Sequence, residues 1–449
     1  MPESDSNAEI RQFKAALVHN PRLALRRLCG DPLRFLPIAF EAAQFADVRE
    51  GQRIARVLER LLSRENPRTM ARLLFDGIPH GVPILSAVAI EAGLLLAARL
   101  QIRTESDRLA KAEIWNGLAE RYAAAGDSRT GWRCSLRAVR LMRRLVSEDR
   151  DHLPRLIIAL QVLAKRCSEI GDHSRAVHLA EDAASRALAA SCDISSLRRY
   201  IGTLDVLSNR LSMAGDDVAA LAEALKAEAL ARDAVHQGAP FLAEQAVCEL
   251  RLATTYTRLR QFEQSLPFAE RAAAGLQSLA HQDPQAYANL YWNAVDLVVG
   301  AHASLGLEPS SDAIIGDARS YFHQLAKDFP AAYLPRFMMY LVRESAALAG
   351  PIASDEAVTR GEEASAAAKQ VSVLHGDLYC VDEGHIHFHL ARLRESRGEW
   401  DLAQNSVRNA LSCFKRTARA ARKSQEWIDE AAVLDEQLAS HILSSKRQA

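Results

Sequence analysis

Apolar and small residues recur along this chain at fixed distances from a series of turn signals. Eight residues before each turn stands a large apolar residue, and seven before it stands, in most copies, a small one. The turns are Gly126–Asp127, Gly171–Asp172, Gly215–Asp216, Arg260–Gln261, Gly306–Leu307, Gly350–Pro351 and Gly398–Glu399, at intervals of 44 to 48 residues. The large residues are Leu118, Leu163, Leu207, Leu252, Val298, Val342 and Leu390. The small positions hold Ala119, Ala164, Ser208, Ala253, Val299, Arg343 and Ala391, of which Arg343 departs most from the pattern.

Small residues also follow the turns. Five residues after the turn, the clearest copies have Gly131, Ala176, Ala220, Ser265 and Ala403, and twelve after it they have Ala138, Ala183, Ala227, Ala272 and Ala410. Glycine closes a helix in the left-handed region, and aspartate caps the next one. A large residue with small ones at helical offsets lets two antiparallel helices approach closely. The pattern therefore predicts a row of helix pairs, each built around one turn.

The first clear copy resembles the tetratricopeptide repeat (TPR), whose first helix carries an aromatic, then leucine and a small residue, then an aromatic. Trp115, Leu118, Ala119 and Tyr122 stand at those positions ahead of the turn at Gly126. The period of about 45 exceeds the family's usual period of about 34 residues, as in long-repeat bacterial and kinesin-light-chain-like versions. The resemblance implies an all-α, right-handed α-solenoid of stacked antiparallel helix pairs.

Three regions are expected. Residues 1–100 form an N-terminal helical region, in which turns near Ala46–Asp47 and Gly81 suggest two degenerate repeats. Residues 101–421 form the solenoid of about seven repeats. Residues 422–449 supply a capping helix and tail, because a solenoid needs a terminal helix with a polar outer side.

In the TPR family the first helix of each pair lines the concave surface. Residues 13, 10, 6 and 3 positions before each turn lie on the side of that helix away from its packing face. They predict a groove made of Glu113, Asn116, Glu120, Gln161, Lys165, Asp205, Asn209, Thr254, Thr257, Asn293, Asp296, Phe337, Tyr340, Glu344, His385, Phe388, Arg392 and Glu395. Six of these residues are acidic and two are basic, which favours a peptide or protein partner of basic character. Phe337, Tyr340 and Phe388 are expected to receive an apolar anchor.

Composition limits the class of partner and the cellular compartment that are expected. Lysine plus arginine and aspartate plus glutamate number 56 each, so the net charge is zero and a nucleic-acid partner is not expected. Seven scattered cysteines without a Cys-x-x-Cys pair indicate small core residues in a reducing compartment. No secretory signal is seen, and Glu91 argues against a membrane span over Val82–Ala98. A cytoplasmic protein is predicted.

Candidate chemistry is sparse. His385 and His389 are four residues apart on a predicted helix and can share a metal ion, but no third ligand accompanies them, so neither a metal nor a cofactor is expected. An arginine stripe at Arg133, Arg137, Arg140 and Arg144 is interpreted as a solvated outer face. No phosphate-binding loop, nucleophile elbow or zinc-protease motif is present.

The sequence therefore predicts a binding scaffold or adaptor without catalytic activity, which holds a protein segment in its groove. Two alternatives stay open. One is a ligand- or peptide-sensing regulatory module that acts on an effector in trans, and the other is a metal-dependent enzyme subunit centred on the histidines.

Overall fold

The computed structural model describes residues 2–63, 67–79, 83–191, 193–307, 313–350, 352–418 and 424–448. Gly81, Val82, Cys192, Pro351 and the predicted end of the solenoid at residue 421 lie outside these ranges. The helices are α1 (Pro2–His19), α2 (Pro21–Gly30), α3 (Pro32–Phe45), α4 (Val48–Leu62), α5 (Pro67–Gly77), α6 (Ser86–Arg99), α7 (Glu105–Ala124), α8 (Ser128–Glu148), α9 (Leu153–Glu169), α10 (His173–Ala189), α11 (Ile194–Met213), α12 (Asp217–His236), α13 (Leu242–Arg258), α14 (Phe262–Gln282), α15 (Pro284–Leu305), α16 (Ala313–Asp328), α17 (Pro330–Ala347), α18 (Asp355–His375), α19 (Cys380–Ser396), α20 (Trp400–Ala418) and α21 (Ser424–Gln448). Short 3-10 turns precede α6, α9 and α19 at Pro83–Leu85, Arg150–His152 and Gly376–Tyr379.

The described residues contain no β-strand, and a single isolated bridge joins Ala349 to Ala353. The predicted all-α architecture is confirmed. Within the same residues, no helix combines the length and the apolar character that a membrane span requires.

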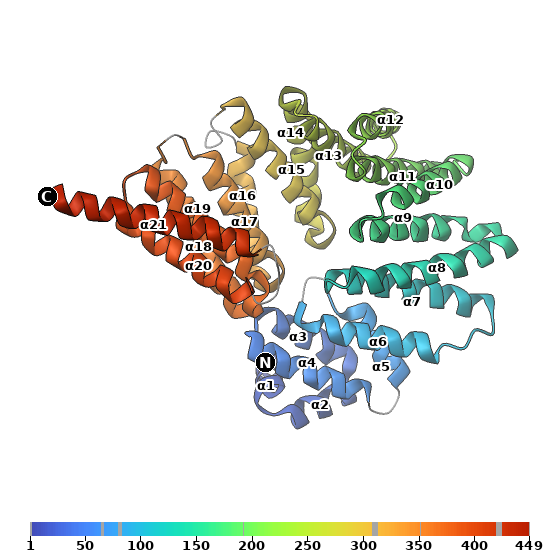
Figure 1. Cartoon of the computed structure of the whole chain (residues 1–449). Helices are drawn as coiled ribbons and strands as arrows, with labels where there is room; N and C mark the ends of the chain where they lie inside the picture. The colour runs from blue at the N-terminus through green and yellow to red at the C-terminus, as the bar shows by residue number, and fades with distance from the viewer. Residues whose placement is uncertain are drawn as a thin grey trace. The chain divides into compact units, whose positions relative to one another are not determined.

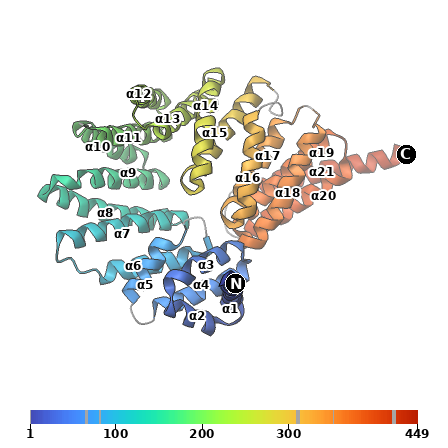
Figure 2. The ribbon, with the colours of Figure 1, turned by 180° about the vertical axis from the view of Figure 1, so that it is seen from behind.

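The chain divides into two compact units, which are described separately. Unit 1 comprises Met1–Phe40 and Arg53–Leu297, and unit 2 comprises Glu41–Gln52 and Val298–Ala449. In unit 1, α7 packs on α8, α9 on α10, α11 on α12 and α13 on α14, and each pair also contacts the next (Figures 1 and 2). In unit 2, α17 packs on α18 and α19 on α20. The predicted helix pairs are present in both units.

The predicted terminal helix is α21. It packs on α20, and Ala431, Leu434 and Leu438 are buried against Val407 and Phe414. Apolar residues on one side of α21 thus cover the last helix pair of unit 2.

The turns have the expected backbone. Gly126, Gly171, Gly215, Gly306 and Gly398 all have positive φ, between 70° and 91°. Arg260, which replaces the glycine in one copy, also takes this conformation, with φ of 59°. Aspartate caps follow, as at Asp127, whose Oδ1 accepts a hydrogen bond of 3.0 Å from the Thr130 amide.

Small residues twelve positions apart bring the two helices of each pair together. A Cβ added to Gly131 would lie 2.8 Å from the Ala119 carbonyl oxygen. In the α11–α12 pair, Ser208 Oγ donates to the Ala220 carbonyl at 2.8 Å. The two backbones come so close at this point that larger side chains do not fit.

In the α17–α18 pair the sequence-derived register is wrong by two residues. Arg343, assigned to the small position, is exposed, whereas Ser345 is fully buried and its Oγ donates to the Ala357 carbonyl at 2.6 Å. Gly350 lacks the positive φ of the other turns. Gly350 is therefore not the turn residue of this copy, and the positions assigned along α17 by their distance from Gly350 are shifted by two residues.

The corrected register places Glu344 where the clear copies have leucine. Its side chain is 1% exposed and forms ion pairs with Arg319 of α16, whose Nε lies 3.1 Å from Oε2, and with Arg360 of α18, whose Nε lies 3.5 Å from it. A buried carboxylate needs such partners because removing it from water is costly. The α17–α18 helix pair is therefore stabilised by ion pairs at the position where the clear copies have a leucine.

Candidate functional site

The first helices of the pairs in unit 1 contact one another from pair to pair: α7 touches α9, α9 touches α11, and α11 touches α13. Helices that meet in this way lie on the inner side of a curved row. We call the solvent-facing side of α7, α9, α11, α13 and the unit 1 part of α15 the inner face.

Most predicted groove residues in unit 1 reach this surface. The exposed side chains are those of Glu113, Glu120, Lys165 and Asn293. The partly buried ones are those of Asn116, Gln161, Asp205, Asn209, Thr254, Thr257 and Asp296. The offset prediction thus identified accessible side chains. Whether they bind anything stays a prediction.

Two of the carboxylates have arginine partners from the next pair. Arg251 of α13 donates to both oxygens of Asp205, at 2.7 and 3.3 Å, and Arg155 Nε lies 3.6 Å from Glu113 Oε1. The Arg251–Asp205 pair is largely buried, whereas the Arg155–Glu113 pair is half exposed and therefore weak. Asp205 thus contributes less negative charge to the inner face than the sequence indicated.

A hollow of about 160 Å³ opens on α11, α13 and α15. Its lining includes Asp205, Glu244, Val247 and Tyr287. Glu244 Oε1 accepts from Arg198 Nε at 2.7 Å, while its Oε2 is buried with no hydrogen-bond partner among the described residues. The Oδ1 atom of Asn116 on α7 is also buried and has no hydrogen-bond partner among the described residues. Buried acceptors without donors are uncommon in folded proteins.

Sequence reasoning missed Glu244. It lies in the first turn of α13, sixteen residues before the turn at Arg260, and so precedes all four offsets used to predict the groove. An acidic residue in the first turn of a helix is favoured by the helix dipole, which gave no reason to assign it to a site.

In unit 2 the prediction fails for two residues. Tyr340 is 3% exposed and its hydroxyl donates to the Ile315 carbonyl at 2.9 Å, and Glu344 is the buried carboxylate described above. Neither can line an open groove. The cause is the two-residue shift of register in α17, which turns both side chains toward α16 and α18.

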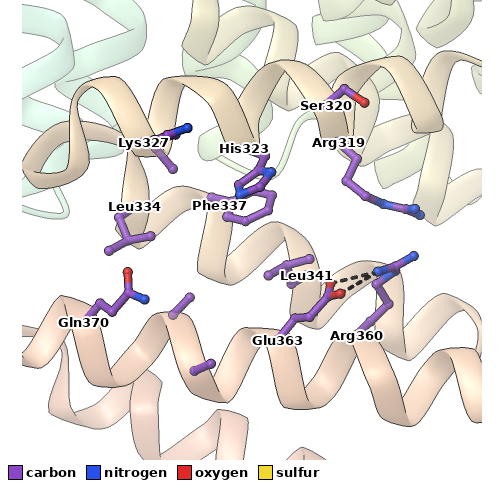
Figure 3. Close-up of a pocket in the computed structure, with 13 residues that line it drawn as sticks. Arg319, Ser320, His323, Lys327, Leu334, Phe337, Leu341, Arg360, Glu363 and Gln370 are labelled. Carbon is purple, nitrogen blue, oxygen red and sulfur yellow. Dashed lines mark hydrogen bonds and ion pairs between the residues drawn. The ribbon is translucent and has the colours of Figure 1, made fainter.

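Phe337 lines a cavity of about 490 Å³ between α16, α17 and α18 (Figure 3). Leu334, Phe337 and Leu341 supply apolar surface from α17, and the His323 ring stacks on Phe337 with centroids 5.4 Å apart. Charged and polar groups surround this surface, namely Arg319, Lys327, Arg360, Glu363 and Gln370. Arg360 donates to both Glu363 oxygens, at 2.9 and 2.8 Å. Apolar surface with a few polar groups is typical of a ligand site.

The remaining predicted residues lie on α19. The exposed His385 contacts Trp427 and Phe414 edge-on, with ring centroids 4.6 and 5.2 Å away. Arg392 lies over the Phe388 ring, 5.4 Å from its centroid, and pairs with Glu395 at 3.1 Å. These side chains interact mainly with their own helix and with the C-terminal helices.

The two histidines proposed as a weak metal pair have different neighbours. His389 Nε2 lies 3.0 Å from Ser345 Oγ on α17, whereas His385 lies among the aromatic rings of α20 and α21. Burial lowers the pKa of the His389 imidazole. Among the described residues, groups of three potential ligands occur elsewhere, at Cys380, Glu383 and Cys413 and at Glu105, Asp149 and His152.

No family model and no curated protein sequence matches the chain. Solved structures of helical repeat proteins are similar to it. The apo form of the quorum sensor NprR from B. thuringiensis aligns over 92% of this chain and 100% of its own, at 10% identity and a TM-score of 0.49. A STAND protein with a tetratricopeptide repeat sensor from Pyrococcus horikoshii covers 90% of this chain and 54% of its own, at 13% identity and 0.48. BtubC (BKLC) from P. vanneervenii covers 65% and 92%, at 16% identity and 0.39.

None of these similarities assigns a ligand or an activity to the chain. In its own geometry the protein has the consecutive antiparallel helix pairs of a TPR-like repeat, as the sequence predicted.

Proposed function

We propose that the protein is a cytoplasmic scaffold that binds an extended or helical segment of another protein on the inner face of unit 1. The observation that carries this proposal is the set of accessible polar side chains on the first helices, with the exposed Glu113 and Glu120 and a hollow lined by Asp205 and Glu244. A lysine or arginine side chain of a bound segment would pair with the exposed carboxylates.

The charge of the inner face supports a partner of basic character. Glu113 and Glu120 are exposed on α7, and Asp205 and Glu244 line the hollow. Because Asp205 is neutralised by Arg251 and Glu244 is paired with Arg198, the preference rests chiefly on Glu113 and Glu120. Exposed carboxylates of this kind affect the association rate and the choice of partner more than they affect the affinity.

The test is the affinity of a purified partner, obtained by co-purification, for the full chain and for a Glu113→Lys/Glu120→Lys/Glu244→Gln variant. We expect the variant to bind roughly 10- to 100-fold more weakly, since two attractive charges become repulsive and one acceptor is weakened. The loss should shrink as salt is raised, because exposed charges are screened.

A matched variant, Glu181→Lys/Glu263→Lys, reverses two exposed charges on the second helices α10 and α14 and should bind as the natural chain does. Equal affinity of the inner-face variant and the natural chain would refute the proposal. So would an equal loss in the matched variant.

A second candidate is a sensor whose unit 2 cavity takes a small organic anion, after which the protein acts on an effector in trans. The cavity favours it, because apolar surface from α17 lies beside the exposed Lys327. In a thermal-shift screen of aromatic carboxylates, a ligand at about 100 times its Kd should stabilise the protein by about 2.7 kcal/mol. Lys327→Glu should abolish that shift, and Lys165→Glu in unit 1 should leave it intact. A shift that survives Lys327→Glu would exclude the cavity.

A further inference from the structure

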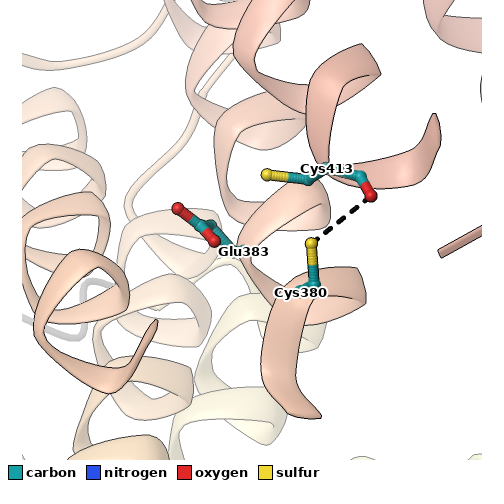
Figure 4. Close-up of side chains that lie close together, drawn as sticks. All are labelled: Cys380, Glu383 and Cys413. Atoms are coloured by element: carbon teal, nitrogen blue, oxygen red, sulfur yellow. Dashed lines mark hydrogen bonds between the residues drawn. The ribbon is translucent and has the colours of Figure 1, made fainter. Parts of the chain in front are cut away.

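Two buried thiols and a carboxylate meet where α19 packs on α20 in unit 2 (Figure 4). Cys380 and Glu383 stand three residues apart on α19, and Cys413 approaches them from α20. Their Sγ and carboxylate oxygen atoms all lie within 4.8 Å of one another. The exposed fractions are 1% for Cys380, 3% for Cys413 and 9% for Glu383. Donors in a tetrahedral zinc site are about 3.5 Å apart, so a contraction of about 1 Å would bring these atoms to bonding positions.

The surroundings of Glu383 match those of a metal-ligating carboxylate. Ser372 Oγ donates to Glu383 Oε2 at 2.8 Å, and His387 Nε2 lies 4.0 Å from Oε1. His387 is one turn further along α19 and is 5% exposed. Partners that hold a carboxylate in place are usual around metal sites.

Arg416 supplies the charge that such a site would need. Its Nη2 lies 3.2 Å from Glu383 Oε2 and 3.3 Å from Cys413 Sγ, while 46% of the side chain remains exposed. Two thiolates and one carboxylate around a divalent ion carry one net negative charge, which the guanidinium would balance. Being half exposed, Arg416 can withdraw toward solvent and still donate to a thiolate.

We propose that Cys380, Cys413 and Glu383 bind one zinc ion between α19 and α20. Thiolates and a carboxylate are donor types that zinc accepts, and a water molecule would take the fourth tetrahedral position. Binding releases the two thiol protons and leaves the oxidation states unchanged: two S–H bonds break and two Zn–S bonds form. A cysteine thiol ordinarily carries its proton at neutral pH, so the metal displaces two protons when it binds.

The full-length protein should be stripped with a chelator under reducing conditions and titrated with zinc, with bound metal measured by elemental analysis. We expect about one zinc ion per chain, release of about two protons per ion, and a raised unfolding temperature. Cadmium used as a probe should show the ultraviolet charge-transfer band of thiolate ligation.

Cys380→Ser and Cys413→Ser should each weaken zinc binding more than about 100-fold, since loss of an outer partner alone costs about 10- to 100-fold. Cys134→Ser and Cys167→Ser, which change buried thiols in unit 1, are the matched controls and should retain the ion. Far-ultraviolet circular dichroism of the stripped variants reports whether they fold. Binding unaffected by both unit 2 variants, no retained zinc, or a Cys380–Cys413 disulfide in freshly isolated protein would overturn the proposal.

Discussion

Glu344→Ala is expected to destabilise unit 2 by about 3–5 kcal/mol, the usual effect of removing one partner from a buried ion pair. Arg319 would then lose its carboxylate partner and face Arg360, which keeps Glu363 as a partner. Arg360 is 15% exposed and Arg319 is 27% exposed, so neither is fully solvated where it stands. Denaturant unfolding followed by circular dichroism would measure the change.

Two further variants separate charge from packing. Glu344→Leu restores the residue type of the clear copies yet should still destabilise, because both arginines stay. The triple variant Arg319→Met/Glu344→Leu/Arg360→Met should recover most of the stability, since an apolar replacement of a whole buried ionic group is often neutral or better. Glu436→Ala, an exposed site on α21, should change stability by less than about 0.5 kcal/mol. A Glu344→Ala variant as stable as the Glu436→Ala control would contradict the assigned role.

Arg121→Met should destabilise unit 1 by about 3 kcal/mol or more, because two hydrogen bonds from a charged donor are lost. Arg121 is 5% exposed, and its Nη2 donates to the carbonyls of Phe75 and Ile78, the latter at 2.9 Å, at the C-terminal end of α5. Hydrogen bonds from a charged donor contribute about 1.5–3 kcal/mol each, and methionine keeps the apolar stem while removing them. The guanidinium also lies over the Phe75 ring, 5.2 Å from its centroid.

The effect should be local. Hydrogen exchange of the α5 amides should accelerate in Arg121→Met, because the helix loses its anchor to α7. Arg133→Met, at an exposed position on α8, is the matched control and should leave both stability and α5 exchange unchanged. Unaltered exchange in α5 would show that Arg121 does not hold that helix.

Sequence reasoning succeeded where the pattern is local. The turns at Gly126, Gly171 and Gly215 and the small residues on each side predict helix pairs because backbone conformation and close approach restrict those positions strongly. It failed at α17, where Gly350 resembles a turn but Ser345 and Ala357 set the register. A glutamate in a leucine position cannot be recognised without knowing that arginines from α16 and α18 reach it.

Buried charged residues were not predicted from the sequence. Arg121, Arg166 and Arg210 stand five residues before successive turns, and all three are less than 9% exposed. Arg166 donates to the Ala119 carbonyl at 3.4 Å and pairs with Glu169 at 3.0 Å. Charged residues were assigned to solvent by default, so this repeated interior position was overlooked.

The proximity of Cys380 and Cys413 could have been predicted from the sequence. Ala391 and Ala403 are the small positions of the α19–α20 pair, seven residues before and five after the turn at Gly398. In an antiparallel pair, moving back eleven residues on one helix and forward ten on the other leads from that contact to Cys380 and Cys413. The cysteines were instead compared for nearby spacing along the chain, which an antiparallel pair does not require.

The most direct test of the scaffold role uses a photo-crosslinking amino acid placed at one position at a time in the full chain within cells. On the inner face it would replace Gln161, and on the outer arginine stripe of α8 it would replace Arg140, which is exposed. We expect a discrete crosslinked protein from Gln161 that disappears in the Glu113→Lys/Glu120→Lys/Glu244→Gln background. Crosslinking from Arg140 with none from Gln161 would contradict the central claim that the inner face of unit 1 is the binding surface.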